Sequence, residues 1–143
     1  MYRRILVTLE HSRTDRAILA HVRGLARAVG ARLLLIHVAD GVMARNLKAL
    51  DYRESDEMRR DRAYLDAEVA ALVADGFDAE AVLAAGDPGA EICACAAREG
   101  CDLIAMATHG HRGLNDLLRG SVANDVRHRT AIPVLMVLDR PTP

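Results

Sequence analysis

The residues best suited to ligand chemistry in this 143-residue chain lie in a glycine-containing segment, residues 106–122. The segment follows an apolar stretch, contains glycines at positions 110, 113 and 120, and passes into a helix-like pattern at Gly120-Ser121. Glycine lets the backbone approach a ligand closely, and N–H groups at the start of a helix bind anions. We therefore expect the N–H groups of Gly120, Ser121 and Val122 to bind the phosphates of a nucleotide, with Gly110 turning the chain out of the preceding strand.

Other side chains of this segment could strengthen phosphate binding. The Ser121 hydroxyl is a further donor, and Arg112 and Arg119 could add charge-assisted contacts. A helix N-terminus contributes only about 0.3–1 kcal/mol per anionic charge, whereas micromolar binding needs about 8 kcal/mol. Contacts with the base and the ribose must therefore supply most of the binding free energy.

The better-known nucleotide and catalytic motifs are missing from the sequence. There is no G-x-x-x-x-G-K-[ST] motif, and Lys48, the only lysine, is far from a glycine loop, which excludes the P-loop mechanism. The turn at residues 8–12 has no glycine, so a dinucleotide-binding fingerprint fails where it would have to be. The three cysteines Cys93, Cys95 and Cys101 lack metal-ligand spacing and are expected to be small apolar residues. We expect neither catalytic nor metal-binding residues.

The hydrophobic pattern predicts five strands that alternate with four helices. Strands are expected at residues 3–9, 32–38, 77–85, 102–107 and 132–138, and helices from a Ser12 or Thr14 cap to Gly30, from about 56 to 76, at 88–99 and at 120–129. This alternation is typical of an α/β, Rossmann-like fold, here a single domain with a doubly wound five-stranded parallel sheet and helices on both faces. Ligands bind such sheets beyond the carboxyl ends of the strands, so Thr8 to Ser12 and Val38 are expected to complete the site.

Three further groups are expected to be structural or solvated. His37 ends an apolar strand, where a histidine is more often a hydrogen-bonding group than a catalyst. The charged run at residues 51–62 is predicted to be a solvated helix face. The tail at about 139–143 is expected to be loose.

The net charge and the apolar last strand limit the kinds of partner that the chain is expected to have. A net charge of −1 gives no electrostatic footprint for nucleic acid or an anionic membrane, so neither is expected as a partner. The chain has no apolar run of transmembrane length and no signal peptide, which predicts a cytoplasmic protein. The apolar strand Val134–Leu138 is expected at the sheet edge, where pairing with its own copy would form a homodimer.

Several stretches carry a recognisable pattern when taken together. They are ILVTL followed by an acidic residue and a serine, the strand ending in His37-Val38, the Gly86-Asp87-Pro88 turn, the glycine segment and the closing PVLMV. Over nearly the whole chain they resemble the universal stress proteins, in which the spacing Gly110-x9-Gly120-Ser121 is similar to the later part of a G-x2-G-x9-G-[ST] loop. The resemblance implies the fold of the adenine nucleotide alpha hydrolases, a homodimer, and binding of ATP, ADP or AMP with Mg²⁺ sharing the phosphate charge.

The resemblance also implies roles for individual residues. Val38 would lie against the adenine, and Glu10 would stand where the family's aspartate contacts the base or the ribose. Met106 and Ala107 would line the nucleotide beside the fourth strand. The ribose and phosphates would be held by Gly110, Gly120, Ser121 and Val122.

Three residues depart from the family pattern. Ala107 stands where the loop motif begins with glycine, and Glu10-His11 stand where nucleotide-binding members carry Asp-Gly. The leading hypothesis is a dimeric, nucleotide-binding stress-response or signalling module with at most slow hydrolysis. The alternative is a nucleotide-free interaction protein of the same fold, in which these residues mark a lost site. An enzyme such as a phosphohydrolase is disfavoured because no catalytic set of residues is recognisable.

Overall fold

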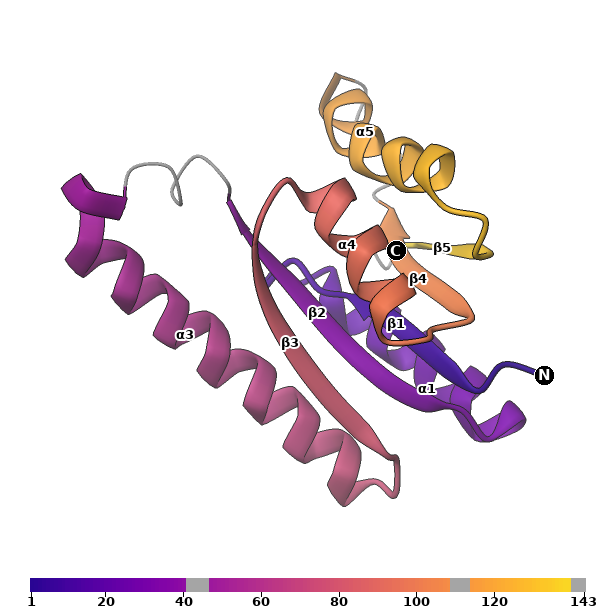
Figure 1. The fold of residues 1–143 in the computed structure, drawn as a ribbon. Coiled ribbons are helices and arrows are strands. Elements are labelled where there is room, and N and C mark those ends of the chain that lie inside the picture. The colour runs from indigo at the N-terminus through magenta and orange to yellow at the C-terminus, as the bar shows by residue number, and fades with distance from the viewer. Residues whose placement is uncertain (41–46, 109–113, 140–143) are drawn as a thin grey trace.

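A parallel sheet forms the centre of this computed structural model, which describes residues 1–40, 47–108 and 114–139, with side chains described at 1–39, 56–108 and 122–139 (Figure 1). The strands are β1 (Arg4–Thr8), β2 (Arg32–Asp40), β3 (Ala79–Gly86), β4 (Leu103–Thr108) and β5 (Val134–Leu138). They lie in the order β3-β2-β1-β4-β5, and every neighbouring pair is parallel. The helices are α1 (Asp15–Val29), α3 (Leu47–Ala74), α4 (Pro88–Arg98) and α5 (Leu114–Arg129). The predicted α/β fold with a five-stranded parallel sheet is confirmed.

Helices cover both faces of the sheet, as the continuous apolar runs of its strands predict. Strand β1 shows the alternation: Val7 belongs to the core cluster shared with α1 and α3, whereas Leu6 belongs to the cluster shared with α4 and α5. Leu65 of α3 packs in the first cluster, and Ile92 of α4 and Val126 of α5 pack in the second. Because both faces of the sheet are buried, the carboxyl-end rim of the strands is where a ligand can reach it.

Helix α3 is longer than the sequence pattern predicts. It begins at Leu47, whereas a connecting segment with only short helical turns was expected before about residue 56. Residues 47–55 are rich in Leu, Lys, Ala, Arg and Glu, which are good helix formers, so the helix extends even where no apolar stripe repeats. Within the described ranges, no helix is both long and apolar enough to cross a membrane.

Helix α5 also begins earlier than predicted, at Leu114 rather than at Gly120. The stretch LNDLLR before Gly120 contains helix-forming leucines and an arginine, and one glycine costs a helix only about 1 kcal/mol relative to alanine. The prediction that Gly120-Ser121 forms a helix N-terminus is therefore wrong. These residues lie inside α5, where an α-helix pairs each N–H with the carbonyl four residues earlier.

The turn between β1 and α1 is built around one buried carboxylate. Asp15 is 1% exposed, and its side chain accepts hydrogen bonds from the backbone N–H groups of Glu10 (2.9 Å), His11 (2.9 Å) and Ser12 (3.3 Å). Thr14 occupies the N-cap position but makes no side-chain cap, so the expected Ser12 or Thr14 cap is wrong. Asp15 instead satisfies the donors of the preceding turn.

We expect Asp15→Ala to lower the free energy of unfolding by about 3 kcal/mol, because it leaves several buried donors without an acceptor. Urea denaturation followed by circular dichroism measures this change. Asp66→Ala is the matched control, since Asp66 is exposed on α3, and it should stay within about 0.5 kcal/mol of the parent chain. Equal midpoints for the two variants would contradict the role given to Asp15.

Candidate functional site

The candidate site is a pocket at the carboxyl ends of β1, β2 and β4, called here the central pocket. It has a volume of about 300 Å³, which is at the lower end of the range of small-molecule sites. It lies where the chain order reverses, because β1 is flanked by β2 on one side and by β4 on the other. Its lining residues are Thr8, Leu9, Glu10, Ile36, His37, Val38, Pro88, Ile92, Met106, Ala107, Val122 and Ala123.

The structure brings together those predicted site residues whose side chains it describes. They come from three strands that are far apart in the sequence, from the turn after β1 and from α5. They are Thr8, Glu10, Val38, Met106, Ala107 and Val122. Gly110 and Arg112 lie outside the described residues, and Arg119, Gly120 and Ser121 are described only as backbone of α5. Their predicted contacts with phosphate therefore remain predictions.

The walls of the central pocket combine apolar surface with a few polar groups. Ile36, Val38, Ile92 and Met106 supply branched or thioether side chains suited to a flat apolar ring. Glu10 provides a carboxylate, one oxygen of which accepts a hydrogen bond from the Thr14 hydroxyl at 3.1 Å. A ligand with an apolar ring and a few hydrogen-bonding groups fits these walls.

The sequence did not predict that some of the residues lining the central pocket belong to the site. Ile92 and Ala123 lie on α4 and α5, where the sequence predicts helices but no ligand contact at these two positions. The apolar residues of a helix have the same periodicity whether they all pack on the sheet or some of them lie beyond the strand ends. Periodicity therefore does not identify which of them line a pocket. The sequence did carry one signal for α4, because the Gly86-Asp87-Pro88 turn is predicted at the carboxyl end of a strand, where ligands bind such sheets. Asp87 caps that helix by accepting the Ala90 N–H at 3.0 Å, and Pro88 lines the pocket.

Ala107 is compatible with the backbone at the position where the family motif begins with glycine. It lies within β4 and is paired with Val137 of β5. Among the described non-glycine residues, positive φ is recorded only for His11, so Ala107 occupies a conformation open to any L-residue. Its methyl group therefore requires no unusual backbone geometry.

His11 has a left-handed backbone, with φ of 60°, at the position where the family pattern has glycine. Its ring is stacked on Tyr64 of α3, with the ring centroids 4.0 Å apart and the planes 18° from parallel. It lines a neighbouring cavity, called here the outer pocket, and is not among the residues lining the central pocket. The ring therefore does not occupy the space of a central-pocket ligand.

The outer pocket holds a side-chain cluster that the sequence pattern assigned to solvent. Asp61 of α3 lies 2.7 Å from His11 Nδ1 and 3.4 Å from His37 Nε2, and its side chain is only 17% exposed. The prediction of a solvated charged face is therefore wrong for Asp61, although Arg59 and Arg62 are exposed. His37 has the predicted structural role, since its Nδ1 lies 2.9 Å from the Leu9 carbonyl oxygen.

Burial raises the pKa of three groups packed beside the sheet, Tyr64, Cys95 and Cys101. The pKa of the Tyr64 hydroxyl is raised, first by burial and then by its 2.6 Å hydrogen bond to Asp15. Burial likewise raises the pKa of the Cys101 thiol to about 11 and raises that of Cys95. These thiols are therefore protonated at neutral pH, as expected of apolar core residues. In the part of the chain that the structure describes, no three His, Cys, Asp or Glu residues are grouped to hold a metal ion.

Comparison with known proteins places this geometry in a family. The family model described as the universal stress protein family matches residues 1–137. Universal stress protein MJ0577 of Methanocaldococcus jannaschii is 27% identical over 157 residues, which cover 96% of this chain and 95% of that protein. A solved structure of MJ0577 has a TM-score of 0.86 and covers 99% of each chain.

Two further relatives are similar over almost their whole length. A universal stress protein of Thermus aquaticus is 32% identical over 138 residues, covering 96% of this chain and 99% of that protein. The structure of an Archaeoglobus fulgidus universal stress protein in complex with dAMP has a TM-score of 0.64 at 20% identity, covering 95% of this chain and 98% of that one. With the family model spanning both the sheet and the central pocket, the chain belongs to the universal stress protein family.

Proposed function

We propose that this chain is a nucleotide-binding stress-response or signalling module that holds an adenine nucleotide, ATP first, in the central pocket. The observation that carries the proposal is the convergence of Thr8, Glu10, Val38, Met106 and Val122 on one pocket at the switch point of the sheet. These residues come from β1 and the turn after it, β2, β4 and α5, and the carboxyl ends of the strands meet there. A relative from Archaeoglobus fulgidus that has a structure in complex with dAMP supports the choice of an adenine nucleotide.

The adenine ring fits the apolar part of the central pocket, between Val38, Ile92 and Met106. Glu10 is the nearby carboxylate suited to a hydrogen bond from the base or the ribose hydroxyls. The dimensions and walls of the pocket are those of a site for one such ring rather than for an extended chain.

Phosphate binding by the glycine segment is a separate part of the proposal. Gly110, Arg112 and Arg119 are the residues proposed to contact phosphate, together with Gly120 and Ser121, and Mg²⁺ would share the phosphate charge. Because Gly120 and Ser121 lie inside α5, their N–H groups reach a phosphate only if the first turns of that helix unwind. The base pocket therefore determines the choice of ligand, and the phosphate contacts add to the affinity.

We propose a binding module rather than a fast enzyme. No group in the central pocket is assigned to activate water, since the Glu10 carboxylate accepts hydrogen bonds from the hydroxyls of Thr14 and Ser12, at 3.1 and 3.5 Å. His37 uses Nδ1 on the Leu9 carbonyl oxygen. Any ATP hydrolysis should stay below about 1 s⁻¹, the low end of ordinary enzyme rates.

Filling the central pocket should weaken nucleotide binding. Ala123→Leu places a larger side chain at a lining position of α5 and should weaken ATP binding at least about tenfold, or about 1.4 kcal/mol. Asn124→Leu is the matched control, because Asn124 is the next residue of the same helix and is exposed. Isothermal titration calorimetry with ATP, ADP and AMP, each with Mg²⁺, measures both variants against the parent chain.

The same titration decides between the two leading hypotheses. A parent chain that binds none of the three nucleotides, and purifies without absorbance at 260 nm, would support the nucleotide-free interaction protein instead. The spectrum is informative because the chain has no tryptophan and only three tyrosines. Equal affinities for Ala123→Leu and Asn124→Leu would place the ligand elsewhere.

We also propose that the chain forms a homodimer through β5. This strand lies at one edge of the sheet, and its residues Val134, Leu135, Val137 and Leu138 are only half-buried within one copy. Met136 is 38% exposed at the centre of the strand. An uncovered apolar edge favours pairing, and an isologous pair brings each strand against its own copy.

Met136→Glu should convert the dimer to a monomer, because a two-fold axis at β5 brings two like charges together in an apolar interface. Sedimentation equilibrium at micromolar concentration should then give 15.5 kDa instead of twice that mass. Val73→Glu changes another exposed apolar residue, 53% exposed on α3, and should leave the dimer intact. A parent chain that sediments as a monomer would refute the proposed dimer.

A further inference from the structure

The central and outer pockets are separated by a shared wall. Glu10, His37, Val38 and Pro88 line both cavities, so the same side chains bound the outer pocket and the central pocket. On the outer side the wall faces α3, which contributes Met58, Arg60 and Asp61 to the outer pocket. Helix α3 thus borders the shared wall from the outer side, and none of its side chains described at residues 56–74 lines the central pocket.

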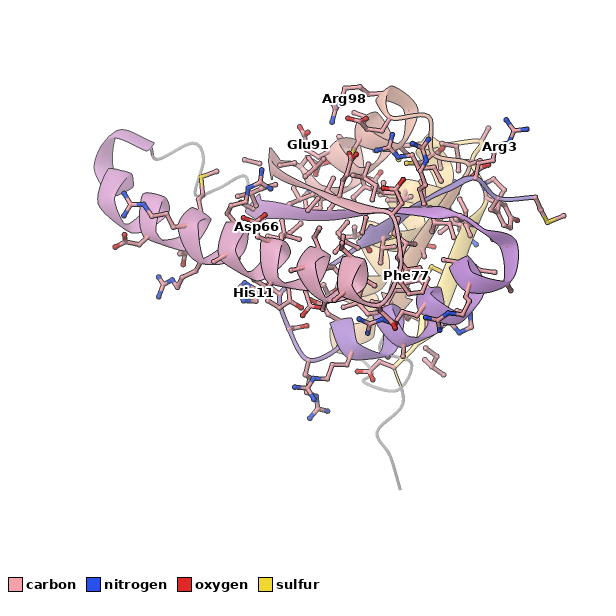
Figure 2. The ribbon with its side chains drawn as sticks, turned by 90° about the horizontal axis from the view of Figure 1, so that it is seen from below. Arg3, His11, Asp66, Phe77, Glu91 and Arg98 are labelled. Atoms are coloured by element: carbon pink, nitrogen blue, oxygen red, sulfur yellow. The ribbon has the colours of Figure 1, made fainter. Side chains whose placement is uncertain are left out.

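Asp61 links α3 to this wall through two histidines. One carboxylate oxygen lies 2.7 Å from Nδ1 of His11, and the other lies 3.4 Å from Nε2 of His37. The Asp61 and His37 side chains are shielded, with exposures of 17% and 14%, whereas the His11 side chain is 35% exposed. In Figure 2 the labelled His11 lies beside α3. His11 and Asp61 are therefore in contact although they are 50 residues apart in the sequence. Shielded charge pairs of this kind are less screened by salt than surface pairs.

The two histidine contacts differ in their need for a proton. His37 Nδ1 lies 2.9 Å from the Leu9 carbonyl oxygen, which can only accept, so Nδ1 carries a hydrogen. Nε2 of His37 then carries a second hydrogen only in the imidazolium form. When His37 is neutral, a lone pair of Nε2 faces the Asp61 oxygen; when it is protonated, the same contact is an ion pair. The contact of His11 needs no second proton, because a neutral ring with its hydrogen on Nδ1 can donate to Asp61.

Other charged and titratable groups surround Asp61, His11 and His37, and they belong to the turn and the helices packed against these three residues. The β1–α1 turn contributes Glu10, and α1 contributes Asp15, which is occupied by backbone N–H groups and by the Tyr64 hydroxyl. Helix α3 contributes Glu57 and Arg60 at the exposed rim and Tyr64 beneath the His11 ring, while α4 contributes Pro88, which does not titrate. Asp61 is the carboxylate within ion-pair distance of both rings.

We propose that Asp61 is a positioning residue for nucleotide binding, which holds His37, and with it the wall shared by the two pockets, against α3. This inference rests on the proposed function of the central pocket. The contact between Asp61 and His37 is strongest when His37 is protonated. Nδ1 then donates to the Leu9 carbonyl oxygen and Nε2 donates to the Asp61 carboxylate. A protein whose binding-competent wall is more populated binds its ligand more tightly, so the affinity should be higher when His37 carries its second proton than when it does not.

The test measures the affinity for adenosine at two pH values. Adenosine has no phosphate and does not itself gain or lose a proton between about pH 6 and about pH 8. Calorimetric titrations at about pH 6 and about pH 8 compare the parent chain with Asp61→Asn, which keeps the size of the side chain and removes its charge. The parent chain should bind about fivefold more tightly at the lower pH, the lower end of typical coupling between linked sites. Asp61→Asn should bind about fivefold more weakly than the parent at the lower pH, and its affinity should not vary with pH.

Two further variants make the result specific. His37→Asn keeps a side-chain donor for the Leu9 carbonyl oxygen but cannot gain a proton, so it should also lose the pH dependence while remaining folded. Asp66→Asn makes the same charge change on the exposed side of α3 and should match the parent chain at both pH values; Asp66 is labelled in Figure 2.

The outcomes separate the inference from the function on which it rests. A parent chain that binds neither adenosine nor ATP at any pH overturns the proposed function, and this positioning role with it. A parent chain that binds adenosine while Asp61→Asn keeps the same affinity and the same pH profile overturns the positioning role alone. Loss of the pH dependence in both Asp61→Asn and His37→Asn, but not in Asp66→Asn, supports it.

Discussion

The buried carboxylate of Asp15 is the contact on which the arrangement of the site depends. It accepts N–H groups of three successive residues, Glu10 to Ser12, and the hydroxyl of Tyr64. A turn without glycine needs such a partner, because His11 at φ 60° adopts a conformation that side chains rarely take. The same carboxylate therefore fixes the turn that places Glu10 in the wall shared by both pockets and His11 in the outer pocket.

This turn also connects the two layers of helices to the rim of the sheet. Tyr64 donates to Asp15 and stacks on His11, so α3 contacts the turn through both its hydroxyl and its ring. On the opposite face, α4 and α5 close the central pocket with Ile92, Val122 and Ala123. A parallel sheet buried on both faces leaves its carboxyl ends as the open rim, and each helix layer supplies one wall of that rim.

The fold was predictable because its signals are local and repeated. Apolar runs such as RLLLIHV read as buried strands, and Gly30, Gly76 and Gly100 follow the helices at positive φ. The start of α5 was not predictable from glycine alone, since Gly120 lies within a helix that the leucines before it extend. The inward position of Asp61 was missed for another reason: its partners His11 and His37 lie in two other elements, and periodicity along α3 carries no information on them.

His11 and Ala107 each stand where the family pattern has glycine, and neither obstructs the central pocket in the way that its larger side chain suggests. A histidine in place of glycine suggests obstruction, yet the Asp15 contacts hold the left-handed turn and the ring packs on Tyr64 in the outer pocket. An alanine in place of glycine suggests a strained loop, yet Ala107 is an ordinary strand residue paired with Val137. Neither substitution removes space from the central pocket by distorting the backbone around it. Whether a sequence departure marks a lost site therefore depends on where the new side chain is directed, and here the ring of His11 is directed toward α3.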